Sequence, residues 1–420
     1  GALVSLDRSL ANLRRRLPAL EQQDISLASQ LRDDLLGFLP WLPSPCGALG
    51  QRLQGYRLEG GQEDKRVLSS KILTGDPHGA VAELGGLVSE ALSGTGRPIL
   101  ALSATGRFIG APGADVLGTV WAYVEDTARN VTLRSAAVTT RISGISQRRE
   151  RRRATEALTR ELWQTMLKQH LASAKHDPGL RGRCRVLLVT GSYDETHWVG
   201  QALRNEAGHR LTVKQVGRDN HEEELGRQEI ERFGAEPEPA VLVAPLSVVA
   251  RGLNILKVDG SGESALSSIF VVVRPLPPTH SAEQMLRHVS YNARLMPPEW
   301  QGAMETLEAE RRNAWRRVER VKRSHAAFSR MDAELRRELV CDTLVELVQL
   351  AGRGRRGGTP VALYLVDEAF HDTAADWREL VRELLEWWES QGALDEMERY
   401  HGAFVHALAN YAQWGARGWR

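Results

Sequence analysis

From residue 183 onward, short apolar runs alternate with stretches in which apolar and polar positions follow a helical period. The apolar runs predict buried strands, namely "CRVLLVTGS", "HRLTVKQV", "AVLVAPL" and "SSIFVVVRPLPP". The stretches between them predict helices, namely "YDETHWVGQALRN" and "HEEELGRQEIERF". After a long helical interruption at 281–348, "VALYLV" resumes the strand pattern. The alternation indicates an α/β fold: a parallel sheet with helices on both faces and functional loops at the carboxyl ends of the strands.

The first part of the chain has a different texture. Leucines recur at helical spacing in residues 1–45, and two weaker helical stretches follow to about 93. "RPILALSATGRF" predicts a short buried strand at 98–102 that opens into a Ser/Thr/Gly loop. A helix is expected at 147–172, beginning with the charge run "RRERRR". Near the C-terminus a helical repeat predicts four core residues: Trp377, Leu380, Leu384 and Trp388.

Composition narrows the class of protein. A chain of 420 residues with 42% hydrophobic content suggests two or three domains. The formal net charge of +2 provides no global field, so any contact with nucleic acid must come from local patches. Only seven of the 55 basic residues are lysine. Arginine has a planar fork that suits phosphate, although GC-rich coding would produce the same bias.

Cysteines and histidines do not suggest a metal site. Cys46, Cys184 and Cys341 are far apart and cannot supply a four-thiolate zinc or iron–sulfur site by themselves. His280 and His288 have no partner at ligand spacing. Because the three cysteines are isolated, a reducing cytoplasm is the simple interpretation. The apolar runs are shorter than the roughly 20 residues that cross a bilayer, and no signal peptide opens the chain.

The stretch "QLAGRGRRGG" at 349–358 is expected to be a cationic, flexible loop beside a buried strand. Arginines in such a loop could neutralise charge on a transferred phosphoryl group, the role called an arginine finger. Taken alone, the stretch could also be a solvated arginine loop or a general phosphate-binding turn.

Four short segments, taken in order, resemble motifs III to VI of superfamily 2 helicases: "LSAT" (102–105), "LLVTGS" (187–192), "ARGLNI" (250–255) and "QLAGRGRR" (349–356). The strand pattern and the helical insertion before the last motif look most similar to the DinG/XPD-like branch. Helicases associated with prokaryotic Argonaute/PIWI-type defence modules are a further resemblance. The match covers roughly residues 98–370.

The resemblance implies a role for each matching position. The catalytic residues that face the triphosphate would be Gln349, Arg353 and Arg356. Nucleotide binding and coupling to the nucleic-acid path would fall to Gly352, Arg251, Gly252, Asn254, Ser103 and Thr105. Contact with the nucleic-acid backbone would fall to Thr190, Gly191 and Ser192. Asn254 departs from the family, since many relatives carry an acid there, and an amide cannot act as a carboxylate.

The same resemblance implies a domain plan and partners. Residues 1–95 would be a helical segment whose position suits the remnant of an arch-like insertion. Residues 96–117 would end a first RecA-like lobe, and residues 118–420 would form the second lobe, with its insertion at 281–348 and a helical tail. The expected function is the C-terminal motor half of an ATP-dependent DNA helicase or translocase. ATP and Mg²⁺ would bind only in the complete enzyme, and the partners would be single-stranded nucleic acid, a P-loop lobe in cis or trans, and defence-system proteins, with no membrane.

A P-loop is missing, because none of the seven lysines follows a glycine. Asp367 and Glu368 could imitate a magnesium-binding acid box, but such an acid needs a P-loop in the same core, so a polar strand exit is the favoured interpretation. The alternative function is a non-catalytic RecA-like scaffold that binds nucleic acid or a partner protein.

Two arginine runs have two interpretations each. "RRERRR" (148–153) and "RRNAWRRVERVKR" (311–323) could follow a phosphate backbone, with Arg312, Arg316, Arg320 and Arg323 on one helix face and Trp315 stacked on a base. In the second interpretation, which is more common in proteins, the run forms an ordinary surface helix with a solvated basic face and one anchoring tryptophan.

Overall fold

The structure is a computed structural model. It describes residues 52–59, 67–74, 93–96, 100, 102–116, 120–217, 224–226, 229–250, 253–276, 287–289, 291–292, 299, 302–325 and 327–415. The chain divides into two compact units, one of Gly1–Leu100 with His280–Arg323 and one of Ala101–Thr279 with Ser324–Arg420. Each unit is described by itself below.

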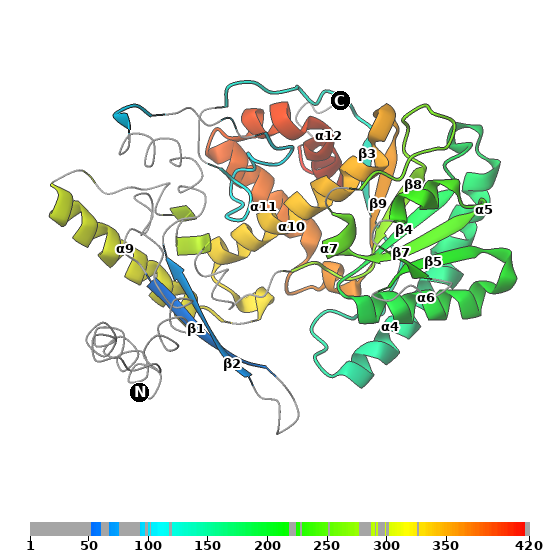
Figure 1. Ribbon diagram of the computed structural model, residues 1–420, viewed down its shortest axis with the longest axis horizontal. Helices are drawn as coiled ribbons and strands as arrows, with labels where there is room; N and C mark the ends of the chain where they lie inside the picture. Colours follow the sequence, from blue (N-terminus) through cyan, green and yellow to red (C-terminus); the bar gives the residue numbers. More distant parts are fainter. Residues whose placement is uncertain are drawn as a thin grey trace, which may run out of the picture. The chain divides into compact units, whose positions relative to one another are not determined.

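The larger unit is built on a parallel sheet (Figure 1). Seven strands of the described chain pair in the order β3-β9-β8-β4-β7-β5-β6, and every pairing is parallel. Their bounds are β3 Val131–Ser135, β4 Arg185–Thr190, β5 Thr212–Val216, β6 Glu224–Leu225, β7 Ala240–Pro245, β8 Leu266–Val271 and β9 Val361–Leu365. The expected α/β class is confirmed, and the arrangement is consistent with a RecA-like fold.

Helices cover both faces of this sheet, which is why its central strands have no polar side. Against one face lie α4 Arg148–Leu162, a π-helical turn Trp163–Leu167, α5 Lys168–His176 and α6 Tyr193–Ala207. Against the other lie α7 Leu246–Val249, α10 Ala333–Gly354 and, beside β3, α12 Leu394–Ala412, while α11 Trp377–Ser390 packs on α10 and α12 (Figure 1). All residues of β4, β7 and β8 are buried, as expected for a parallel sheet covered on two sides.

Short 3-10 turns join these elements. They span Pro178–Leu180, Gly208–Arg210, Ile230–Ala235, Phe328–Arg330, Arg356–Gly358 and Glu368–His371.

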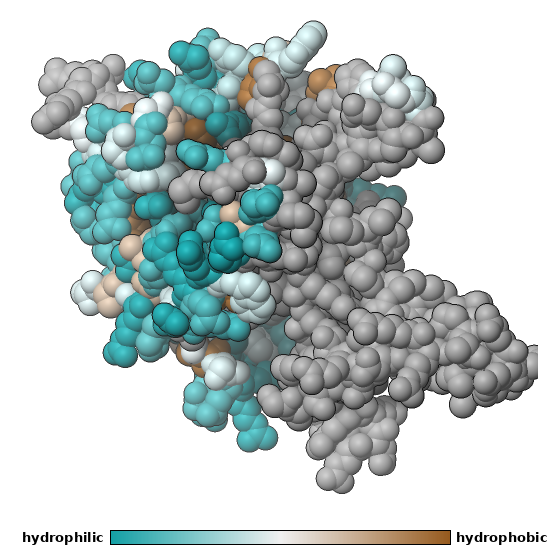
Figure 2. All heavy atoms as spheres, turned by 90° about the vertical axis from the view of Figure 1, so that its left-hand side faces the viewer, coloured by the Kyte–Doolittle hydropathy of each residue, from teal (hydrophilic) through white to brown (hydrophobic). Residues whose placement is uncertain are grey.

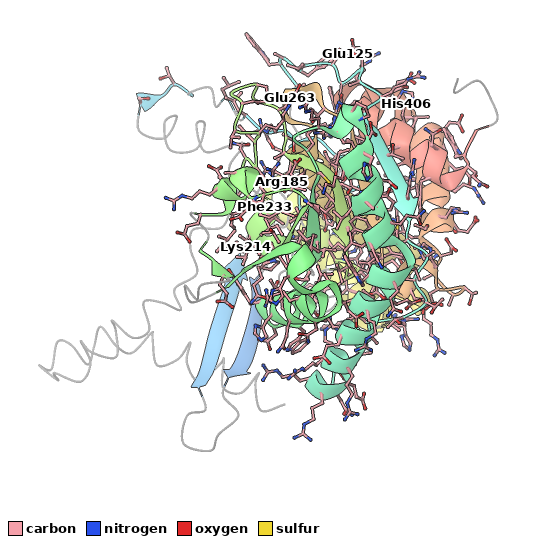
Figure 3. All side chains as sticks on the ribbon, turned by 90° about the vertical axis from the view of Figure 1, so that its right-hand side faces the viewer. Glu125, Arg185, Lys214, Phe233, Glu263 and His406 are labelled. Atoms are coloured by element: carbon pink, nitrogen blue, oxygen red, sulfur yellow. The ribbon has the colours of Figure 1, made fainter. Side chains whose placement is uncertain are left out.

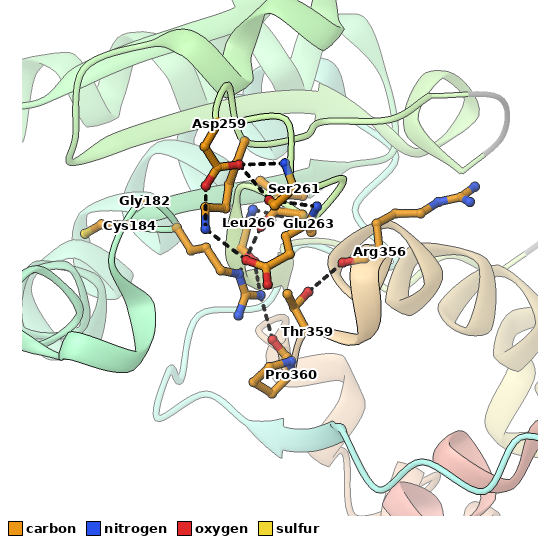
Figure 4. Close-up of polar contacts among 12 residues, drawn as sticks. Gly182, Cys184, Asp259, Ser261, Glu263, Leu266, Arg356, Thr359 and Pro360 are labelled. Carbon is orange, nitrogen blue, oxygen red and sulfur yellow. Dashed lines mark hydrogen bonds and ion pairs between the residues drawn. The ribbon is translucent and has the colours of Figure 1, made fainter.

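Buried arginines hold the amino-terminal edge of the sheet together. Arg183, only 2% exposed, donates to the carbonyl oxygens of Leu266 at 2.6 Å, Pro360 at 2.7 Å and Ser264 at 2.9 Å (Figure 4). Burial lowers the pKa of Arg183, although the charge of Glu263 acts in the opposite direction. The guanidinium therefore joins the starts of β8 and β9 to the segment that enters β4.

Arg185, the first residue of β4, joins this strand to the segment that enters β7. It donates to the carbonyl oxygen of Glu236 at 2.6 and 3.1 Å and pairs with Glu238 at 2.7 Å. Lys214 lies 3.9 Å from the Glu236 carboxylate, and Figure 3 labels Arg185, Phe233 and Lys214 near one another in the view.

The C-terminal helices form a second packed region around the segment that follows "LSAT". Phe108 lies between Trp388 and His401, and the Trp388 indole donates to the carbonyl oxygen of Ile109 at 2.9 Å. The four predicted core residues, Trp377, Leu380, Leu384 and Trp388, are all buried, so that prediction is confirmed. Cys184 and Cys341 are buried free thiols, and burial raises the pKa of Cys184 to about 11.

Several expected elements differ from the structure. The region expected to be weakly helical contains an antiparallel hairpin, β1 Arg52–Glu59 with β2 Val67–Thr74, and strand β3 was not expected at all. The helix expected from "HEEELGRQEIERF" is wrong for its described part, where Glu224–Leu225 pairs with β5 and a 3-10 turn begins at Ile230. A hydrogen bond of 2.9 Å from Gln215 to the Glu224 side chain fixes that pairing.

The strand expected at 98–102 is also wrong for its described residues. Leu100 and Leu102 are not in a strand, and their exposed fractions are 75% and 87%. An apolar strand needs a neighbour for its backbone hydrogen bonds, and no described strand adjoins it. The helix expected over residues 1–45 lies outside the described residues.

In the smaller unit, α9 Ala303–Arg323 is the longest described element. Its Ala314 and Val318 pack with Val289, and Val321 is also buried. No helix in the described parts of either unit has the length and apolar character to cross a membrane. The coloured surface in Figure 2 is mainly hydrophilic, with small apolar patches.

We expect Arg183→Met to destabilise the larger unit by about 3 kcal/mol, because three buried carbonyls lose their donor. Hydrogen–deuterium exchange of β4, β8 and β9 under native conditions measures this loss. The exposed neighbour Arg181 is the control, and Arg181→Met should change stability by less than about 0.5 kcal/mol. Equal effects of the two substitutions would contradict the role of Arg183.

Candidate functional site

The arginine-rich stretch is not a flexible loop. Helix α10 continues to Gly354, Arg355 is its C-cap, and Arg356–Gly358 follow as a 3-10 turn in which Gly357 has a φ of +70°. The helix persists because Leu350 and Ala351 are buried. Gly354 also packs closely on Val361: a Cβ at Gly354 would lie 2.2 Å from the Val361 side chain. The expectation of a mobile loop is therefore wrong.

Arg353 is a structural clamp on the "ARGLNI" segment. Its guanidinium donates to the carbonyl oxygens of Ala250 and Leu253, each at 2.9 Å. Partial burial lowers the pKa of Arg353, and the positive charge of Arg356 lowers it further. An arginine nevertheless stays protonated in a protein. Arg251 and Gly252, which lie between the two carbonyls in sequence, are outside the described residues.

Gln349, one turn earlier on α10, binds the "LSAT" segment. Its amide nitrogen donates to the Thr105 hydroxyl at 3.1 Å, and Thr105 is buried. The Thr105 backbone N–H donates in turn to the Ser103 hydroxyl at 3.2 Å, with Ser103 exposed. Gly352 is exposed, with open space where a side chain would be. The end of α10 thus holds residues from three of the four predicted segments.

Arg356 is the exposed cation of this group. Its carbonyl oxygen accepts from the Ser264 N–H and the Thr359 hydroxyl, each at 3.0 Å, which fixes the turn. Figure 4 shows its side chain extending away from these contacts. Among the described residues, neither Arg353 nor Arg356 forms an ion pair with a carboxylate. The place is therefore electropositive and suited to an anion such as phosphate.

Arg355, between these two arginines, has a different partner. Its guanidinium forms a two-pronged pair with the Asp126 carboxylate at 2.7 and 2.9 Å and donates to the Asn130 side chain at 2.6 Å. This contact ties the end of α10 to the segment that enters β3. Sequence reasoning missed Asp126 and Asn130, since nothing in their spacing connects them with residue 355.

Asn254 is exposed, and its backbone N–H donates to the Glu231 carboxylate at 2.8 Å. Among the described residues, this contact with Glu231 and the hydrogen bonds from Arg353 hold the segment in place.

The "VTGS" residues are used within the fold. The Thr190 hydroxyl is buried 2.6 Å from the Thr196 hydroxyl. The Ser192 hydroxyl accepts from the Glu195 N–H at 3.2 Å, while the Glu195 carboxylate accepts from the Gly191 N–H at 2.7 Å. The pair caps the start of α6 in a variant of the capping box, in which the glutamate accepts from Gly191, the residue before the N-cap Ser192. Gly191 and Ser192 remain exposed, so their backbone could still meet a ligand.

The predicted site residues lie at two opposite edges of the sheet. Thr190 ends β4 and therefore lies at the carboxyl edge, with Gly191 and Ser192. The last turn of α10 precedes β9 and meets Arg183, so it lies at the amino edge. The expectation that all functional loops share the carboxyl edge is wrong for "QLAGRGRR", because a helix that leads into a parallel strand must end where that strand begins.

Asp367 behaves as a polar strand exit, the favoured interpretation. Its carboxylate is fully buried and accepts from the backbone N–H groups of Ile142, Ser143 and Ala369 at 2.9 to 3.1 Å. A capped carboxylate of this kind orders a loop and has little capacity left for a metal. In the part of the chain that the structure describes, no group of three or more His, Cys, Asp or Glu side chains could hold a metal ion. His280 lies outside that part, and His288 is buried with its Nδ1 3.2 Å from the Asn292 amide nitrogen.

Comparison with known proteins gives a fold-level likeness only. No protein-family model and no curated protein sequence matches this chain. A solved structure named XPD_APO is similar over 73% of this chain and 44% of its own length, with 15% sequence identity and a TM-score of 0.30. The chain thus spans less than half the length of that structure. A likeness this weak carries no argument about the fold or the activity of this chain.

We expect Arg353→Ala to loosen the segment around Ala250–Leu253, because two carbonyls lose a charged donor. Backbone exchange over 246–256 should speed up about tenfold, a local cost of about 1.4 kcal/mol. Arg356→Ala is the matched control, since its exposed side chain holds nothing in the described residues, and it should leave that exchange unchanged. The assignment of Arg353 as a clamp fails if both variants exchange at the same rate.

Proposed function

We propose that this chain supplies an arginine-bearing RecA-like lobe to a nucleic-acid motor driven by nucleoside triphosphate. The observation that carries the proposal is the end of α10, where Gln349 binds the "LSAT" segment, Arg353 holds the "ARGLNI" segment and Arg356 stays exposed. Residues from three segments that resemble helicase motifs thus converge on one helix end, although they are far apart in sequence. A general phosphate-binding turn would not need the two flanking segments.

The environments of the two arginines suggest different tasks. Arg353 donates hydrogen bonds to the backbone carbonyls of Ala250 and Leu253, so it positions the "ARGLNI" segment. Arg356 has a fixed backbone and an exposed guanidinium that forms no ion pair with a described carboxylate, which suits it to meet a phosphate brought by another lobe. In this proposal Arg356 is the finger and Arg353 is a positioning residue, a finer division than the motif alone implies.

The remaining parts of the motor would come from elsewhere. ATP and Mg²⁺ would be held mainly by a P-loop lobe in cis or in trans, since this sequence has no glycine–lysine pair. The bound triphosphate would supply the driving reaction, and Arg356 would offset charge on its oxygens. Single-stranded DNA is the proposed substrate, with Gly191 and Ser192 at the carboxyl edge as backbone contacts, and a prokaryotic defence module is the proposed setting.

A non-catalytic scaffold is the second candidate. The observation that favours it is Asp367, whose carboxylate is engaged by backbone N–H groups and is therefore not available as an acid box. A non-catalytic scaffold does not need an exposed arginine that meets a triphosphate at the end of α10. The two candidates therefore differ in what substitution of Arg356 does.

We expect Arg356→Ala to reduce kcat for ATP hydrolysis about 10³-fold or more, with a smaller effect on KM, because finger arginines act on the transition state. The measurement uses the native assembly purified through a tag on this chain. Arg153→Ala, an exposed arginine on α4, is the control and should keep wild-type turnover. An Arg356→Ala assembly with at least a third of wild-type kcat would rule out the finger, and an assembly without ATPase activity would favour the scaffold.

A further inference from the structure

The second half of α9 is strongly basic. From Arg311 to Arg323 the sequence "RRNAWRRVERVKR" holds seven basic residues and one acid, Glu319. This charge is local, since the whole chain carries a net charge of only +2. The proposed motor function does not use this helix, so its charge needs another explanation.

The helix separates its apolar and basic residues onto two faces. Ala314, Val318 and Val321 form the buried face. Residues at spacings of three and four share the opposite face, namely Arg312, Trp315, Arg316, Glu319, Lys322 and Arg323. Apart from the partly buried Glu319, these residues are all exposed. The buried face already anchors the helix, so Trp315 is not required for that purpose.

Trp315 is therefore an exposed aromatic platform among cations. Its exposed fraction is 56%, and the Lys322 ammonium lies 5.7 Å from the ring centroid. Arg312 and Arg316 flank it three residues before and one residue after. The alternative interpretation of Trp315 as an anchoring residue is not supported by this exposure.

The acids on this face do not cancel its charge. Glu308 lies 3.5 Å from Arg312, while Glu319 lies 3.6 Å from Lys322 and 3.7 Å from Arg323. These are long, exposed pairs, worth about 0–1 kcal/mol each, so a phosphate could replace the carboxylates at little cost. Arg316 donates only to the neutral Asn313 side chain at 3.1 Å among the described contacts.

We propose that this face of α9 binds single-stranded nucleic acid, with an unpaired base stacked on Trp315 and flanking phosphates on Arg312 and Arg316. A stacked base must be unpaired and accessible, which excludes the interior of a duplex. The arginine forks suit phosphate oxygens. The site goes beyond the proposed motor function and does not depend on nucleotide hydrolysis.

Fluorescence anisotropy of labelled twenty-nucleotide oligo(dT) and oligo(U), with the 420-residue chain and no nucleotide, tests the proposal. Trp315→Ala should weaken binding about tenfold to a hundredfold, while Trp315→Phe should retain most of the affinity. Arg312→Gln with Arg316→Gln should reduce the slope of log K against log salt by about 1.4, or about 0.7 per lost phosphate contact. The two oligonucleotides distinguish DNA from RNA as the preferred strand.

Matched controls separate a site from general charge. Trp121→Ala removes a tryptophan that is 86% exposed in the larger unit and should leave affinity unchanged. Arg149→Gln with Arg153→Gln removes two exposed arginines of α4 and should leave the salt slope within about 0.3 of wild type. Binding by Trp315→Ala within twofold of wild type, an equal loss in Trp121→Ala, or equal affinity for a duplex of the same length would overturn the proposal. None of these outcomes depends on ATPase activity, so its failure is distinguishable from failure of the motor function.

Discussion

The larger unit depends on satisfying backbone carbonyls at the amino edge of its sheet. At the edge where the strands of a parallel sheet begin, carbonyls at or just before the first residue of a strand can lack a ladder partner. Here Arg183 binds three of these carbonyls at hydrogen-bonding distances of 2.6 to 2.9 Å, and Arg185 binds that of Glu236. Buried backbone groups are costly when they lack a partner, so the guanidinium groups do what a strand neighbour does elsewhere.

The same constraint explains why three nearby arginines at the end of α10 and just after it differ in their capacity to bind a ligand. Arg353 repeats the pattern of Arg183 and binds backbone carbonyls of a connecting segment. Arg355 is neutralised by Asp126. Arg356 follows the end of the helix, where its backbone is fixed by Ser264 and Thr359 and its side chain extends from the protein. Sequence alone presents three equivalent cations, whereas packing leaves one of them for a ligand.

The sequence predicted the central strands well because they are buried on both faces, which produces unbroken apolar runs such as those of β4, β7 and β8. It failed at β3, where Val131 and Leu133 are buried but Thr132 and Arg134 are exposed, a pattern too short to stand out. It also failed at "GRGRRGG", where glycine suggested mobility. Gly354 instead permits close contact between α10 and Val361. Gly357 has a positive φ and lies against Glu263, so that a Cβ at Gly357 would lie 2.8 Å from the Glu263 Cα. Glycines required by close contact and glycines in a flexible loop look the same in a sequence.

The two edges of the sheet impose a further condition on any motor function. The capped start of α6, with Gly191 and Ser192, lies at the carboxyl edge, and Arg356 lies at the amino edge, so no single small ligand can touch both. A link between the two edges must pass through the sheet or along α10. Midway along α10, the Thr343 hydroxyl lies 3.3 Å from the carbonyl oxygen of Pro275, beyond the end of β8. At the C-terminal end, the last turn of α10 contacts Arg183. Helix α10 spans the sheet from one edge to the other as a packed, continuous element. Leu344, Leu347 and Leu350 along the helix are fully buried, so a ligand that moved α10 at the Arg356 end would have to disturb close-packed contacts between the two edges.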